Sequence, residues 1–266
     1  MGRARLMYEM TVEEVRNGLK ENQTVILPVG VVEQHGYHLP LSVDIHNSYE
    51  SARRASDICG CFVAPSVHYS FSGGMLPGTI NISPQTYGLV IMDIFRSLIL
   101  QGFKNIILLM GHGGTEAIRA ANDAVENFQR LNPNIEGITI SIVRFGRLSP
   151  IYSRAIEDKD FHAGKYETSL MLYWKPELVK MDKARLDTPE LVKLMRTDQD
   201  AFLNKTKLVD MEYVIPKLTQ REDIEVGVMG DFTDASAELG REMAGQIAKR
   251  LAEIAERLQR ENGAQS

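Results

Sequence analysis

The stretch from Val25 to Val32 reads VILPVGVV and is followed directly by EQHG at 33–36. A continuous apolar run with little alternation is typical of a strand that is buried on both faces of a parallel sheet. A second run of this kind, IILLM at 106–110, precedes GHGG at 111–114. Polar and glycine-rich segments therefore follow two predicted strands, at the edge of the sheet where α/β folds bind ligands.

The chain around these two runs alternates between helix and strand patterns. Predicted helices cover residues 46–58, 85–101 and 115–130, and further strands are predicted over Cys61 to Pro65 and Gly137 to Phe145. Thr11 and Glu14 predict a capping box at an earlier helix. A long loop rich in Gly, Ser and Pro is expected at 69–83. This order predicts an α/β three-layer sandwich with a mainly parallel central sheet.

The C-terminal part of the chain divides into two patterns. Residues 146–235 are less regular, whereas about 235–261 carry apolar residues at three- and four-residue spacing and predict a long amphipathic helix. Core packing is the first interpretation of its apolar face, and an oligomer contact is the second. No clear linker or repeat interrupts the chain, so we expect one domain over residues 1–266 that includes this helix.

Composition excludes several classes of protein. The 266 residues are 44% hydrophobic and 24% charged, with a net charge of −5, so no overall field attracts nucleic acid or anionic lipid. Cys59 and Cys61 lie one residue apart, too close for an unstrained disulfide, and are expected as reduced thiols. We find no signal-peptide pattern and no apolar run near the ~20 residues that span a bilayer. The expected location is the cytoplasm, without membrane or nucleic-acid partners.

Acidic and histidine residues gather at the predicted strand ends. Glu33 and His35 point to the same side if the strand continues, and Asp44 follows nine residues later. His112 lies in the turn after the second buried strand. Carboxylate oxygens and imidazole nitrogens suit Zn, Mn or Fe(II), and a carboxylate such as Asp44 can bridge two ions. The alternative is a polar loop whose side chains satisfy backbone groups.

Other interpretations of these segments stay open. GHGG at 111–114 could cradle a phosphate at a helix start, although it lacks the third glycine and the later acidic residue of a dinucleotide site. Glu167 precedes an apolar run, so it is either a ligand or a carboxylate that complements a helix N-terminus. His162 is either a functional residue or a polar loop residue.

Several motifs together resemble those of the creatininase (creatinine amidohydrolase) family. They occur in the family's order: LPVGVVEQHGYHLPL at 27–41 with Asp44, PGTI at 77–80, GHGG at 111–114, HAGKYETS at 162–169 and GVMGD at 227–231. The resemblance implies an α/β fold, a binuclear metal centre and hydrolysis of a small-molecule substrate. It also implies a closed homo-oligomer such as a hexamer.

The resemblance also carries site residues over to this chain. It implies four metal ligands: Glu33, His35, Asp44 and His112. Asp44 is the implied bridge, and Glu167 matches the acidic position of a family branch that includes a formamidopyrimidine deformylase and a peptide-maturing peptidase. Creatininase itself has an acidic ligand where this chain has Gly114, so we expect the second metal to recruit Glu167 or, as the alternative, Glu116. Creatinine is therefore not the expected substrate.

The expected function is that of a metal-dependent hydrolase. A hydroxide that bridges two ions, Zn, Mn or Fe(II), would attack the carbonyl of a small cyclic amide, formamide or related substrate. Gly113 and Gly114 are expected to hold the oxyanion, His162 to protonate the leaving group, and Gly78 to contact the substrate.

Three other functions compete with this one. The same machinery could open a cyclic diketone, such as an inositol-derived diketone, by C–C cleavage. A nucleotide-binding module without enzymatic activity is a second alternative, and a catalytically inactive family member is a third.

Overall fold

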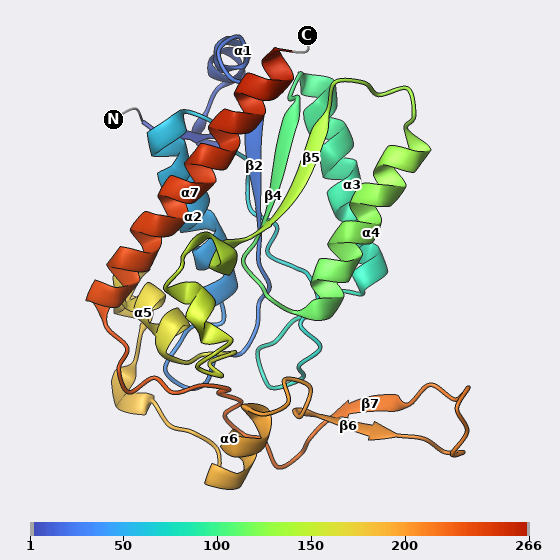
Figure 1. The fold of residues 1–266 in the computed structure, drawn as a ribbon, viewed down its shortest axis with the longest axis vertical. Coiled ribbons are helices and arrows are strands. Elements are labelled where there is room, and N and C mark those ends of the chain that lie inside the picture. The colour runs from blue at the N-terminus through green and yellow to red at the C-terminus, as the bar shows by residue number, and fades with distance from the viewer. Residues whose placement is uncertain (1–2, 265–266) are drawn as a thin grey trace.

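The computed structural model describes residues 3–264, and its centre is a five-stranded sheet (Figure 1). The strands run in the order β1-β3-β2-β4-β5, and every neighbouring pair is parallel. Their bounds are β1 Arg5–Leu6, β2 Thr24–Val29, β3 Phe62–Val63, β4 Asn105–Met110 and β5 Thr139–Arg144. The predicted α/β class with a mainly parallel sheet is therefore confirmed.

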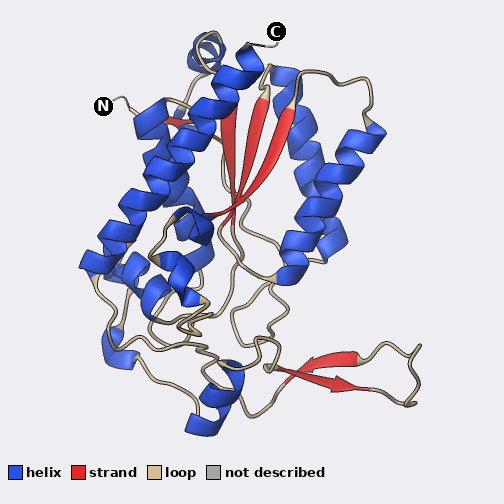
Figure 2. Ribbon diagram, viewed as in Figure 1, coloured by secondary structure: helices blue, strands red, loops and turns tan. Residues whose placement is uncertain are grey.

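Helices cover both faces of this sheet (Figure 2). One layer holds α2 (Val43–Cys59) and α7 (Ala237–Gly263) with α5 (Lys165–Trp174), and the other holds α3 (Pro84–Gln101) and α4 (Thr115–Leu131). Successive residues of the central strands face opposite layers: Ile107 and Leu109 pack in the α2/α7 layer, whereas Ile106 and Leu108 pack in the α3/α4 layer. This burial on both faces explains why the two apolar runs do not alternate.

The remaining elements lie outside these layers or connect them. They are α1 (Val12–Leu19), α6 (Pro189–Met195), β6 (Leu203–Thr206), β7 (Lys217–Gln220) and the 3-10 turns η1 (Met7–Glu9), η2 (Phe145–Leu148), η3 (Tyr152–Ala155), η4 (Pro176–Leu178) and η5 (Met181–Lys183). The capping box of Thr11 and Glu14 at α1 is confirmed. Residues 146–235, which the sequence pattern leaves irregular, contain α5, α6 and an antiparallel β6–β7 pair.

Two predicted boundaries differ from the structure in ways that affect the site. α2 begins at Val43, three residues before the predicted start, so Asp44 lies in its first turn. The N-cap residue Ser42 is followed three residues later by Ile45 rather than by Glu or Gln, so the sequence carries no capping box at this helix start. β2 ends at Val29 rather than Val32.

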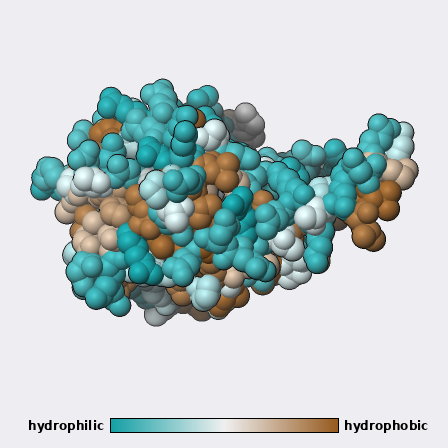
Figure 3. All heavy atoms as spheres, turned by 90° about the horizontal axis from the view of Figure 1, so that it is seen from below, coloured by the Kyte–Doolittle hydropathy of each residue, from teal (hydrophilic) through white to brown (hydrophobic). Residues whose placement is uncertain are grey.

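The β6–β7 pair projects from the body of the protein and carries apolar side chains at its tip (Figure 3). Leu208, Tyr213 and Ile215 between the two strands are 101%, 83% and 88% exposed. Among residues 3–264, no helix combines the length and the apolar character that a bilayer crossing requires.

Two glycines bring the first turn of α2 against the ends of β2 and β4. A Cβ atom on Gly30 would lie 2.6 Å from the backbone nitrogen of Ile45. A Cβ on Gly111 would lie only 2.1 Å from the carbonyl oxygen of Asp44. No other residue type fits at this distance without moving α2, so these glycines determine where the Asp44 carboxylate lies relative to both strand ends.

We expect Gly111→Ala to destabilise the metal-free protein by about 1–3 kcal/mol, because the added methyl group overpacks the contact with α2. Gly113→Ala is the matched control, since a Cβ at Gly113 meets nothing within 4 Å; its effect should stay within about 0.5 kcal/mol. Urea unfolding in EDTA measures both. Equal stability of the two variants would show that the close approach does not position α2.

Candidate metal centre

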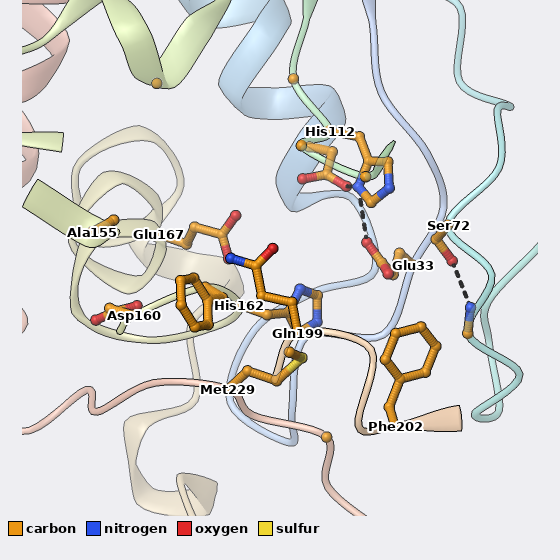
Figure 4. A pocket seen from close by; sticks show the side chains of 18 of the residues that line it. Glu33, Ser72, His112, Ala155, Asp160, His162, Glu167, Gln199, Phe202 and Met229 are labelled. Atoms are coloured by element: carbon orange, nitrogen blue, oxygen red, sulfur yellow. Dashed lines mark hydrogen bonds and ion pairs between the residues drawn. The ribbon is translucent and has the colours of Figure 1, made fainter. Parts of the chain in front are cut away.

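Five buried acidic and imidazole side chains converge at the carboxyl edge of the sheet. Figure 4 shows three of them, Glu33, His112 and Glu167. Of the five, two follow β2, one follows β4, and one comes from the first turn of each of α2 and α5. Their exposed fractions are 7% for Glu33, 0% for His35, 9% for His112, 2% for Asp44 and 8% for Glu167. The structure thus brings together all five residues that the sequence predicts as metal ligands.

Asp44 lies between the two imidazoles and faces each with a different oxygen. Its Oδ1 is 3.7 Å from His35 Nε2, and its Oδ2 is 3.2 Å from His112 Nδ1. Glu33 Oε2 lies 3.3 Å from His112 Nδ1, whereas Glu167 Oε2 lies 3.7 Å from His35 Nε2. Three possible ligand sets result, each with its donor atoms within 4.8 Å of one another: two share Asp44, Glu33-Asp44-His112 and His35-Asp44-Glu167, and the third is Glu33-His35-His162.

The donor atoms fit divalent cations. Glu33 Oε2 and His35 Nε2 are buried, and neither makes a hydrogen bond within residues 3–264. Buried polar atoms without partners are rare in folded proteins and are often explained by a missing ion. Carboxylate oxygens and imidazole nitrogens without thiolates suit Zn, Mn or Fe(II) at a catalytic site.

Electrostatics reinforce this interpretation. Burial alone would lower the pKa of His35, but the neighbouring carboxylates of Asp44 and Glu167 raise it to about 9. Burial alone would raise the pKa of Asp44, but His112 and His35 hold it well below its usual range. In the metal-free protein, protons on the imidazoles therefore supply the positive charge that the buried carboxylates require.

Glu167 has two roles that the sequence analysis treats as alternatives. It lies in the first turn of α5, and its Oε2 accepts a 2.7 Å hydrogen bond from the backbone N–H of Ala163. Its Oε1 accepts a 3.4 Å hydrogen bond from the Tyr152 hydroxyl. Ala163 has a positive φ of 53°, which is strained for a residue with a Cβ, and such strain is concentrated at functional sites. The carboxylate both stabilises the helix start and faces His35.

His162 lies beside the metal-ligand cluster, with its ring centroid 4.1 Å from that of His35. Its Nε2 is 2.7 Å from the carbonyl oxygen of Gln34, and because a carbonyl only accepts, this nitrogen carries a proton and donates. The backbone of His162 pairs with that of Met229 in an antiparallel bridge. The Gly227–Asp231 segment thus holds His162 in place.

Two predicted residues lie outside the site. Glu116, the alternative to Glu167, lines a separate surface groove between α3 and α4. Gly78 is not among the residues that line the cavity; it has a φ of 94° and a Cβ there would lie 2.7 Å from Leu41 Cδ1. The structure therefore places Gly78 in a tight turn outside the lining of this cavity.

Gly113 and Gly114 do line a cavity of about 380 Å³ together with the metal-ligand cluster. A Cβ at Gly114 would lie 2.2 Å from His112 Nε2, so the imidazole occupies the space of a side chain at 114. An acidic ligand at this position, as in creatininase, is incompatible with this ring orientation. The second ligand set instead draws its carboxylate from Glu167 on α5.

The cavity also contains residues that the sequence analysis misses. Tyr152 supports Glu167, and the Asp160 carboxylate accepts a 2.7 Å hydrogen bond from the backbone N–H of Lys165. Burial raises the pKa of Asp160 to about 7. Arg144 and Arg147 form part of the cavity wall. All of these except Arg144, at the end of β5, come from the irregular segment, where no periodicity or spacing marks them.

We expect the metal-free protein to lose stability between pH 6.5 and 9. A histidine whose folded pKa is raised contributes stability that is present below its ordinary pKa of about 6.5 and is lost as the pH rises through the folded value. For His35, with a pKa of about 9, the loss is at most about 3 kcal/mol. Urea unfolding in EDTA at several pH values measures this.

His112, whose pKa the Glu33 and Asp44 carboxylates raise against the effect of burial, acts in the same direction. His35→Asn should weaken the pH dependence, whereas His68→Asn, at an exposed histidine, should preserve it. A wild-type unfolding free energy that is flat or rises over this pH range would contradict the proposed charge state.

Comparison with known proteins identifies relatives over most of the chain. The family model for creatinine amidohydrolase, Creatininase, matches residues 8–255. A mycofactocin precursor peptide peptidase from Mycolicibacterium smegmatis is 28% identical over 249 residues, 88% of this chain and 85% of the relative. A creatinine amidohydrolase from Pseudomonas putida is 25% identical over 199 residues, 69% and 76% of the two chains. A 3-dehydro-scyllo-inosose hydrolase from Thermotoga maritima is 26% identical over 184 residues, which cover 66% of this chain and 58% of the relative.

Solved structures agree with this relationship at the level of the fold. A structure described as "Creatininase Mn" has a TM-score of 0.70 at 21% identity and covers 94% of this chain and 97% of its own. A mutant creatininase of "Zn-Zn type" has a TM-score of 0.71 at 22% identity, with coverages of 95% and 97%. The family model, the relatives and the fold agree, and the chain belongs to the creatininase family.

Proposed function

We propose that this protein is a metal-dependent hydrolase that cleaves the C–N bond of an amide in a small-molecule substrate. The observation that carries the proposal is the position of Asp44, whose two oxygens face different imidazoles. Each imidazole is paired with a further carboxylate, Glu33 or Glu167. This arrangement has the shape of a site in which one carboxylate bridges two cations.

Glu33, Asp44 and His112 would hold one ion, and His35, Asp44 and Glu167 the other. When bound, a pair of divalent cations lowers the pKa of water and polarises a carbonyl. Manganese and zinc are favoured because similar folds are described as "Creatininase Mn" and "Zn-Zn type". Tyr152 positions Glu167 through its hydroxyl group.

Other residues of the cavity would assist the reaction. Gly113 and Gly114 line the cavity next to His112, and their backbone N–H groups would donate to the oxygen of a tetrahedral intermediate. The Nε2–H of His162 is bound to the Gln34 carbonyl, which orients the ring and leaves Nδ1 as the atom that exchanges protons. His162 would therefore deliver a proton to the leaving nitrogen from Nδ1.

The names of the relatives favour amide chemistry. The peptidase and the creatinine amidohydrolase are both described by C–N bond activities, and the peptidase matches the larger share of this chain. The inosose hydrolase keeps C–C ring opening of a cyclic diketone as the second candidate. Creatinine itself is disfavoured because Gly114 replaces the acidic ligand of creatininase.

Metal analysis tests the centre first. We expect about two equivalents of divalent metal per chain in the purified protein. Asp44→Asn should reduce this to less than about one, because both ligand sets share Asp44. Glu116→Gln is the matched control, since Glu116 is also an acidic residue in the first turn of a helix but lines another groove; its metal content should equal that of the wild type. Wild-type protein without metal but with tight nucleotide binding would overturn the proposal.

A substrate panel then tests the reaction. We expect the metal-loaded protein to hydrolyse one or more lactams, formamides or short peptides, with activity that EDTA abolishes and added metal restores. Asp44→Asn should lose at least about a hundredfold in activity. Hydrolysis of cyclic diketones alone would overturn the C–N assignment in favour of C–C cleavage.

A further inference from the structure

One wall of the cavity carries two arginines that the proposed reaction does not use. Arg144 is the last residue of β5, and Arg147 lies in the 3-10 turn η2. Both are exposed, and both line the cavity that contains Glu33 and Glu167. The two residues are only three positions apart in the chain and line the same cavity.

The sheet places this arginine pair close to the metal-ligand cluster. Arg144 is paired in register with Met110, two residues before His112. Neighbouring strands lie about 4.8 Å apart, so Arg144 begins only one strand away from the segment that carries His112. A group bound by the arginines would therefore belong to the same small molecule as a group bound at the cluster.

Neither arginine has a partner that neutralises it. Over residues 3–264, no hydrogen bond or ion pair involves the side chain of Arg144 or Arg147, in contrast to Arg250 and Arg257 on α7, which pair with glutamates. Two like charges on one turn repel each other unless an anion lies between them.

The acidic residues of the cavity do not supply that anion. The carboxylates of Glu33, Asp44 and Glu167 would be neutralised by two divalent cations, whose four positive charges equal the negative charges of these three carboxylates and one hydroxide. Asp160, a further carboxylate in the wall, accepts the backbone N–H of Lys165 and could offset only one of the two arginines. The loaded cavity therefore keeps an excess of positive charge at this wall.

A different wall of the cavity is apolar. Phe202, Met195 and Ile224 lie there, within a buried cluster that also includes Phe161 and Met229. A substrate that fills the cavity would place an apolar part against these side chains and a charged part against the arginines. The carbonyl that reacts would lie between the apolar part and the charged part of the substrate, beside the metal-ligand residues.

We infer that Arg144 and Arg147 form a binding site for an anionic group of the substrate, a carboxylate or a phosphate, beside the proposed hydrolytic centre. Guanidinium groups bind both anions through charge-assisted, often paired hydrogen bonds. The inference rests on the proposed function and narrows its substrate class to amides that carry a negative charge away from the bond that is cleaved.

The test uses hydroxamates, which chelate metal ions, and the metal-loaded protein. Monohydroxamates of dicarboxylic acids with two to five methylene groups are compared with their methyl esters, with phosphonate analogues and with acetohydroxamate, by isothermal titration calorimetry. We expect the best carboxylate or phosphonate to bind at least about tenfold more tightly than its neutral ester. The tighter of the two anions identifies the substrate group.

Variants separate the arginine site from the metal centre. The double variant Arg144→Gln, Arg147→Gln should bind the anionic hydroxamate no more than about twofold more tightly than its neutral ester. Its metal content and its affinity for acetohydroxamate should stay unchanged. Arg119→Gln is the control, because this exposed arginine lines the other groove. The inference is overturned if acids and esters bind equally at every length, or if the preference survives in the double variant. Failure of acetohydroxamate to bind the wild type would instead overturn the proposed metal centre, and the inference with it.

Discussion

The site depends on one constraint, the burial of the Asp44 carboxylate between two imidazoles from different strand ends. A charge at 2% exposure is costly unless it is compensated, and here His35 and His112 compensate it when no metal is bound. Gly30 and Gly111 make this position possible because they let α2 touch the backbone beyond both strands. The contact between α2 and the carboxyl edge of the sheet therefore positions the carboxylate on which the proposed chemistry depends.

The other residues of the site come from the strand ends and from α5. Parallel strands bring Glu33, His35 and His112 to one edge, which is the general advantage of this type of sheet for building sites. α5 then adds Glu167, which is held by the strained Ala163 and by Tyr152. This support fixes the orientation of a ligand before an ion binds, and preorganisation of that kind is what metal sites require.

Sequence patterns predict the central features well and the periphery poorly. Apolar runs without alternation identify β2 and β4, because burial on both faces leaves a strong signal. Motif resemblance identifies the five acidic and imidazole residues that converge at the candidate metal centre. The helical position of Asp44 is missed because Ile45, three residues after Ser42, leaves this helix start without a capping box in the sequence. Tyr152 and Arg147 lie in an irregular segment whose conformation is set by tertiary contacts, and Gly78 shares a motif with the family without reaching the cavity. Distances between separate segments follow from packing, which one-dimensional patterns do not encode.

The most direct test of the shared carboxylate is anomalous X-ray diffraction from crystals of the zinc- or manganese-loaded protein. We expect two peaks about 3.5–4 Å apart on either side of Asp44. One peak should lie beside Glu33 and His112, and the other beside His35 and Glu167. A single ion bound without Asp44, or two ions separated by more than about 6 Å, would contradict the bridging role and the hydrolytic centre built on it.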